Sequence, residues 1–219
     1  MNEFFREVDE DFRRDQVAKF WKRWGGLIIG AVVIVVVGVA GWRYWDYLET
    51  TRAHEAAARF YEAQQQIEQT NVAAGQGVLE ELAASGSGGY TLLARFRLAA
   101  SQGQQDPDAG ALAYDALADD ANVPANLRDL ARLRAALLRL DTQYDIAAAQ
   151  LQSLAAPENA YRHSAREALG VAALNRGDYE AAGTWFDQLA IDAETPQALR
   201  GRLEIYSALV AAGPLQPTQ

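Results

Sequence analysis

The side chains that most often carry chemistry are few in this chain. The two histidines, His54 and His163, lie far apart, and neither stands at a metal-ligand spacing from a carboxylate or a cysteine. We interpret both as solvated residues on helices. The sequence contains no cysteine, so neither a disulfide nor a thiol nucleophile is available.

Acidic pairs offer little more. Asp106-Pro107-Asp108 and Asp119-Asp120 lie at expected helix ends or turns, where capping is a common role for carboxylates. They lack the spacing of a calcium-binding loop. No glycine-rich phosphate loop follows a strand, and no serine sits in a nucleophile elbow. We expect no catalytic, metal-binding or cofactor-binding residues, and only a deep pocket lined by ionisable groups would revive an enzyme or a small-ligand receptor.

One long apolar segment constrains everything else. No charged residue lies between Arg23 and Arg43. About nineteen residues rise roughly 28 Å as a helix, close to the hydrocarbon thickness of a bilayer. A strand of this length is unusual, and in lipid the backbone must pair within its own segment, so we predict one transmembrane helix. Its representative residues are Trp24, Gly26, Leu27, Gly30, Ile34, Val39 and Trp42.

A cleaved signal peptide is the main alternative, because Val39-Ala40-Gly41 has small residues where a peptidase could cut. The stretch before the apolar core is long and acidic, and aromatic residues flank the segment at both ends as in membrane-interface belts. We therefore favour an uncleaved anchor. Gly26 and Gly30 are spaced for packing against another membrane helix, with plain contact to lipid as the alternative.

Lysine and arginine set the expected orientation. They are concentrated before the anchor, whereas the following flank has only Arg43, Arg52 and Arg59. We predict a cytoplasmic tail over residues 1–23, an anchor over 24–45 and a periplasmic domain over 46–219, in a bacterial inner membrane. The formal net charge of −9 argues against nucleic acid as a partner.

The remaining chain is rich in alanine, leucine, glutamine, glutamate and arginine, which favours an all-α fold. The helix is expected to continue beyond Trp45. Asn71 to Gly77 is expected to break it, and Ser85-Gly86-Ser87-Gly88-Gly89 to form a loop. Helices then recur in pairs about 35 residues apart, a period typical of helix-turn-helix solenoids. The pairs are 90–102 with 108–119, 126–140 with 144–155, and 161–175 with 178–191.

The third pair is the clearest repeat, and it resembles a tetratricopeptide repeat. Small residues there would let two helices approach closely, Gly177 would supply the turn, and two aromatic residues would fill the groove between repeats. The packing residues are Leu169, Gly170, Ala173, Gly177, Tyr179, Ala182 and Phe186. The two earlier pairs are degenerate, and a plain helical bundle remains their alternative.

A final helix is expected to close the stack. Thr195 would cap it, Pro196 would lie in its first turn, and Gly213-Pro214 would end it. Its apolar stripe comprises Leu199, Leu203, Tyr206 and Val210. One amphipathic helix of this kind seals the last repeat of a solenoid.

Across essentially its whole length the chain resembles the YfgM family of ancillary Sec-translocon subunits. The likeness rests on the charged tail with Phe20-Trp21, the string Gly41-Trp42-Arg43-Tyr44-Trp45 after the anchor, and the degenerate helical repeats. It implies an inner-membrane protein, not an enzyme, that associates with Sec channel subunits and a membrane-anchored periplasmic chaperone and assists exported client proteins. A periplasmic scaffold for envelope or division machinery is the alternative.

Overall fold

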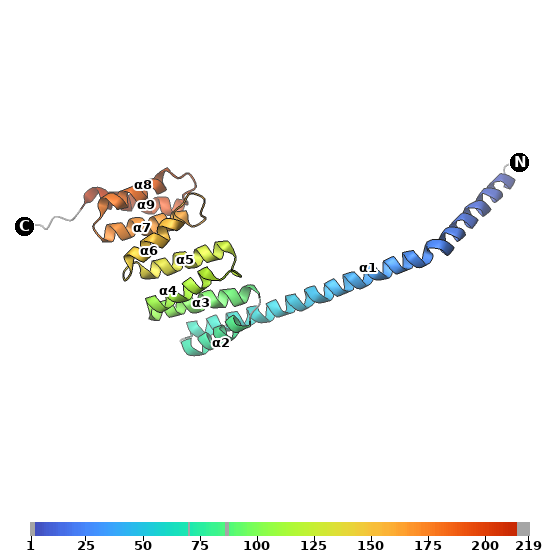
Figure 1. The fold of residues 1–219 in the computed structure, drawn as a ribbon, viewed down its shortest axis with the longest axis horizontal. Coiled ribbons are helices and arrows are strands. Elements are labelled where there is room, and N and C mark those ends of the chain that lie inside the picture. The colour runs from blue at the N-terminus through green and yellow to red at the C-terminus, as the bar shows by residue number, and fades with distance from the viewer. Residues whose placement is uncertain (1–2, 70, 86–87, 214–219) are drawn as a thin grey trace, which may run out of the picture. The chain divides into compact units, whose positions relative to one another are not determined.

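The computed structural model describes residues 3–69, 71–85 and 88–213, with side chains from residue 21 onward. Within these ranges all regular structure is helical, which confirms the predicted all-α class. The helices are α1 (Glu3–Glu68), α2 (Val72–Ala84), α3 (Gly89–Gln105), α4 (Pro107–Asp119), α5 (Ala125–Arg139), α6 (Tyr144–Leu154), α7 (Arg162–Asn175), α8 (Tyr179–Ile191) and α9 (Gln197–Ala212) (Figure 1).

Helix α1 is continuous from the tail, through the apolar segment, into the first helix of the repeat domain. The contacts within the chain define two units, with the boundary inside α1 between Glu55 and Ala56. The first unit contains the part of α1 up to Glu55, and the second contains the rest of α1 with α2 to α9. Continuity beyond Trp45 agrees with the expectation from the sequence.

In the second unit, from α2 to α9, each helix packs against the helices before and after it in the sequence. Helices with odd and even numbers form two layers. In the odd layer a Cβ at Gly103 of α3 would contact Leu138 of α5 at 2.8 Å. In the even layer Gln150 of α6 donates a hydrogen bond to Asp115 of α4 over 3.5 Å. A stack in which each helix pair contacts only the pairs before and after it is a solenoid.

Some hydrogen bonds between successive pairs join residues that are about one repeat apart in the sequence. Gln143 donates to Asp108 over 3.0 Å, and Arg202 donates to Glu167 over 2.7 Å. In each case the two residues are separated by 35 positions. This separation agrees with the period of about 35 residues expected from the sequence.

Four apolar clusters fill the stack, each built from consecutive helices. Small residues dominate: Ala94, Ala111, Ala131, Ala165 and Ala182 are all fully buried. Alanine at these places lets helix backbones approach closely while it retains high helix propensity. The last cluster includes the predicted stripe of α9, whose members Leu199 and Leu203 are buried beside Phe186.

The helix breaks before Val72, since α1 ends at Glu68 and Asn71 is the N-cap of α2, but the predicted break through Gly77 is too long, because α2 contains Gly75 and Gly77. Gly75 is required by close packing rather than by a turn. A Cβ there would lie 2.6 Å from the backbone oxygen of Ala63 in α1. The glycine therefore permits the approach of two helices.

The predicted loop at Ser85 is shorter than expected, because α3 begins at Gly89 after Gly88 with φ of 90°. Gly86 and Ser87 lie outside the described residues. Asp106 caps α4 as predicted, because its side chain accepts hydrogen bonds from the backbone N–H groups of Asp108 and Ala109.

The predicted cap of α9 is wrong. Pro196 occupies the N-cap, and the buried Thr195 hydroxyl instead donates to the backbone oxygen of Leu189 over 2.7 Å. The hydroxyl therefore fastens the α8–α9 connection to α8. At the other end of α9, Gly213 has φ of 63°, and the predicted stop at Pro214 lies outside the described residues.

Candidate functional site

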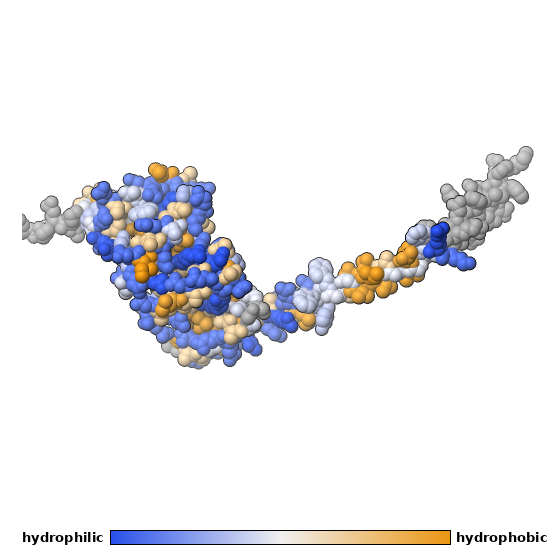
Figure 2. Space-filling model, viewed as in Figure 1, coloured by the Kyte–Doolittle hydropathy of each residue, from blue (hydrophilic) through white to orange (hydrophobic). Residues whose placement is uncertain are grey.

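The apolar stretch of α1 exposes large hydrophobic side chains. Ile34 is 74% exposed and Val37 is 64% exposed, and the stretch is coloured orange in Figure 2. In the described chain, α1 is the one helix long and apolar enough to cross a membrane. Exposing such a surface to water is unfavourable, whereas lipid accommodates it.

The predicted anchor residues all lie on this exposed part of α1. The structure places Trp24, Leu27, Ile34, Val39 and Trp42 with exposed side chains. A Cβ added at Gly26 or Gly30 would meet nothing within 4 Å. The apolar stretch is therefore available for contact with lipid or with another helix.

In the repeat formed by α7 and α8, the two helices pack closely at Gly170. A Cβ there would lie 2.4 Å from the ring of Phe186, which is itself buried and stacks on Tyr206 of α9 with ring centroids 4.9 Å apart. Leu169, Ala173 and Ala182 are buried nearby, Tyr179 is half-buried, and Gly177 has φ of 76° in the connection. The structure thus brings most of the predicted packing residues together.

A recurring arginine escaped the sequence analysis. Residues 93–100 read Leu-Ala-Arg-Phe-Arg-Leu-Ala-Ala, and residues 130–137 read Leu-Ala-Arg-Leu-Arg-Ala-Ala-Leu. The first arginine of each copy points toward the end of α4. Arg95 binds the Asp120 carboxylate over 2.7 Å, and Arg132 donates to the Ala118 backbone oxygen over 3.4 Å. The signal was an internal repeat of eight residues within the longer repeat.

Arg166 of α7 is the equivalent of Arg95 and Arg132, and it belongs to an ionic cluster. One carboxylate oxygen of Asp192 accepts hydrogen bonds from Arg162 over 3.0 Å, His163 over 3.0 Å and Arg166 over 3.2 Å. Arg166 also donates to the backbone oxygen of Ala155, after α6, over 3.1 Å. The cluster therefore connects α7 to the connections that follow α6 and α8.

Hydrogen bonds from Arg162 are the largest of the effects that lower the pKa of Asp192, followed by one from the backbone N–H of Glu194. The carboxylate consequently stays charged across the ordinary pH range. The prediction that His163 is solvated is wrong, because its side chain is 13% exposed and bonded to Asp192. His54 is exposed, as predicted.

Asp120 and Asp192 occupy equivalent places. Each ends a helix of the even layer, and each accepts a hydrogen bond from the backbone N–H two residues later. A proline then begins the next helix in both, within the shared pattern Asp-Ala-x-x-Pro-x-x-Leu-Arg. The carboxylates thus have structural roles at the turns between repeats.

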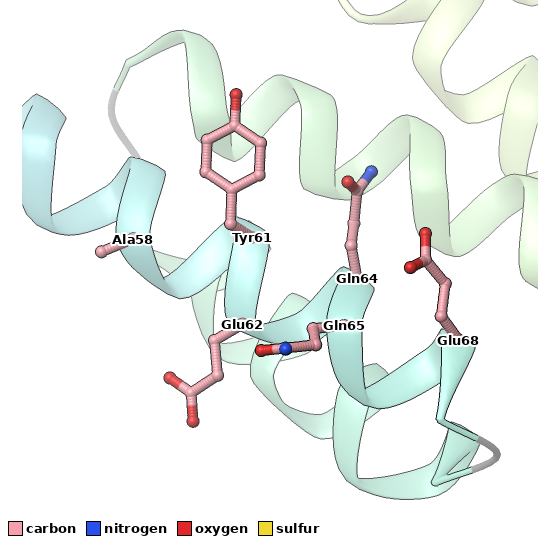
Figure 3. A pocket seen from close by; sticks show the side chains of 6 residues that line it. All are labelled: Ala58, Tyr61, Glu62, Gln64, Gln65 and Glu68. Carbon is pink, nitrogen blue, oxygen red and sulfur yellow. The ribbon is translucent and has the colours of Figure 1, made fainter.

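Little in the described structure suggests a reaction centre. Its histidines and carboxylates form no group of three or more that could hold a metal ion. A hollow on the surface of α1 is lined by Ala58, Tyr61, Glu62, Gln64, Gln65 and Glu68 (Figure 3). All six residues come from one helix, and their side chains point in different directions rather than converging. This is a feature of an open helix surface.

Comparison with known families agrees with the geometry. The tetratricopeptide repeat-like domain matches residues 18–207, which includes the apolar part of α1 and nearly all of the stack. No curated protein and no solved structure gives a significant match. The chain belongs to the tetratricopeptide repeat-like domain family, whose helical repeats generally serve as scaffolds for protein interaction.

Proposed function

We propose that this protein is a membrane-anchored interaction module that works beside the Sec channel. In this proposal α1 holds the repeat domain at the outer face of a bacterial inner membrane, with the N-terminal tail in the cytoplasm. The domain binds Sec channel subunits and a membrane-anchored periplasmic chaperone, and it assists newly exported proteins.

The observation that carries the proposal is the joining, in one continuous helix, of an exposed apolar stretch to the first helix of a repeat stack. The excess of lysine and arginine before the apolar stretch supports the orientation. The string Gly41-Trp42-Arg43-Tyr44-Trp45, on which the resemblance to the YfgM family partly rests, supports the choice of partners.

The mechanism is local concentration. An anchor confines the domain to the thin layer in which the channel and anchored chaperones also lie, so weak contacts suffice for association. Sequence-neighbour packing leaves the outer face of each layer uncovered, which gives an extended binding surface. Leu93 and Leu137 of the odd layer are 50% and 40% exposed on this surface.

Photo-crosslinking in living bacteria tests this function. A photoreactive amino acid replaces Leu93, Leu137 or Ile205 in the odd layer, and Ala149, exposed on α6 in the even layer, serves as the matched control position. We expect odd-layer adducts with Sec channel subunits or an anchored chaperone, identified by mass spectrometry. Adducts with division or envelope-assembly proteins instead, together with localisation at the septum, would support the scaffold alternative.

A further inference from the structure

The second arginine of the eight-residue repeat differs from the first in its contacts. Arg97 and Arg134 occupy equivalent positions in the two copies, 37 residues apart by their numbering. Neither guanidinium has a hydrogen bond or an ion pair with another residue in the described chain. This contrasts with Arg95 and Arg132, which bind the end of α4.

Both arginines lie on the outer face of the odd layer. In α3 the buried residues Ala94 and Ala99 face neighbouring helices, whereas Leu93 and Arg97 lie four residues apart on the opposite side, where Leu93 is exposed. In α5 the buried residues are Ala131, Leu133, Ala135, Ala136 and Arg139. Leu130, Arg134 and Leu137 lie on the remaining side of α5, where Arg134 and Leu137 are exposed and Leu130 is half-buried.

These two helix faces are adjacent, because α3 contacts α5 directly at Gly103 and Leu138. Tyr114 of α4 provides a second measure of proximity. Burial raises the pKa of its phenol, and the positive charges of Arg134 and Arg97 oppose that rise. Both guanidinium groups therefore lie within electrostatic range of the same buried ring.

We propose that these two helix faces bind an apolar segment of a partner protein that carries aspartate or glutamate. The docking surface comprises Leu93, Arg97, Leu130, Arg134 and Leu137. The leucines supply apolar contact, and the two guanidinium groups bind carboxylates. This assignment rests on the proposed function and specifies the chemistry of the partner.

Charge complementarity selects this occupant. The chain has a formal net charge of −9, so two arginines that form no ion pair with another described residue, on helix faces that also carry Leu93 and Leu137, contrast with its general character. A basic partner would be repelled at this place, and a wholly apolar one would leave two guanidinium groups poorly solvated. In the next repeat Ala168 stands where Arg134 stands in α5, which confines the recognition of carboxylates to α3 and α5.

Fluorescence anisotropy with the full chain in lipid nanodiscs tests the assignment, with empty nanodiscs as the blank. The probe is a fluorescein-labelled, C-terminally amidated peptide, Gly-Leu-Glu-Leu-Leu-Glu-Leu-Gly, and its counterpart has glutamine for glutamate. We expect the glutamate peptide to bind about tenfold more tightly, with a preference that weakens as salt is added. The R97Q/R134Q variant should bind both peptides equally.

The matched control is R59Q, because Arg59 is exposed on α1 without a hydrogen bond or ion pair in the described structure. It should retain the wild-type preference. The R97E/R134E variant should instead prefer a lysine version of the peptide. Equal binding of the glutamate and glutamine peptides, no binding of either, or an equal loss in R59Q would overturn the assignment. Crosslinks to Sec or chaperone subunits would survive any of these results, so the two proposals fail separately.

Discussion

Gly170 of α7 faces the ring of Phe186 of α8 with no room for a further atom. An added Cβ would lie 2.4, 2.8 and 2.9 Å from three atoms of that ring. The ring cannot retreat easily, since it is buried and stacks on Tyr206 of α9. One glycine therefore fixes how closely three consecutive helices pack.

G170A should reduce the free energy of unfolding by about 1–3 kcal/mol, as expected for overpacking a well-filled core. Urea unfolding of the full chain, followed by circular dichroism in detergent micelles, measures the change. G201A is the matched control, because Gly201 is also inside a helix but a Cβ there meets nothing within 4 Å. That variant should be unchanged or gain up to about 1 kcal/mol.

Gly177 sets the turn between α7 and α8 by its backbone conformation, since a Cβ there would meet nothing within 4 Å while φ is 76°. G177A should cost about 1–2 kcal/mol, because a side chain is disfavoured in the left-handed region. G177N should cost less, since asparagine tolerates that region better. Equal stability of the alanine and asparagine variants in urea unfolding would contradict this explanation.

Gly177 and Gly75 illustrate what could be predicted from the sequence and what could not. Helical periodicity and the 35-residue spacing gave the helix pairs to within three residues, because apolar patterning reports which face is buried. The presence of a glycine in the sequence does not show why glycine is needed there. Gly177 makes a turn as predicted, whereas Gly75 lies inside a helix and allows the backbone of a neighbouring helix to approach. Only the packed structure distinguishes these roles.

The ionic cluster was missed for a related reason. His163 and Asp192 are separated by 29 positions, and the antiparallel packing of α7 against α8 brings the end of α8 to the start of α7. Motif spacing along a chain cannot report such contacts. The docking surface on α3 and α5 did have a signal in the sequence, namely the repeated arginine pair, but its significance depends on which arginine is already paired.

The Asp192 cluster should make stability depend on acidity. The pKa of Asp192 is lowered in the folded chain, chiefly by hydrogen bonds from Arg162. A carboxyl of this kind contributes stability above its unfolded pKa of about 4, and this contribution is lost as pH falls toward the folded pKa. D192N should therefore be less stable than wild type at pH 7, and the gap should narrow below about pH 4.

Urea unfolding of both proteins at pH 7, 5 and 3 measures that gap. D187N is the control, because Asp187 is exposed on α8 and has no hydrogen bond or ion pair in the described structure. Its difference from wild type should be small at all three values. A gap between D192N and wild type that stays constant down to pH 3 would show that the carboxylate charge is not what stabilises the α7–α8 end.

The membrane anchor gives the last prediction. Ile34 and Val37 are exposed at the middle of the apolar stretch, and a charged residue there opposes insertion by about 3 kcal/mol. I34R/V37R should move the chain from the membrane pellet to the supernatant in alkaline extraction, whereas I34L/V37L should remain in the pellet. N-terminal sequencing of the wild-type protein from the pellet then distinguishes an anchor from a signal peptide. A mature chain that begins near residue 42 and is soluble would exclude anchoring, because the residues that face lipid would no longer be present.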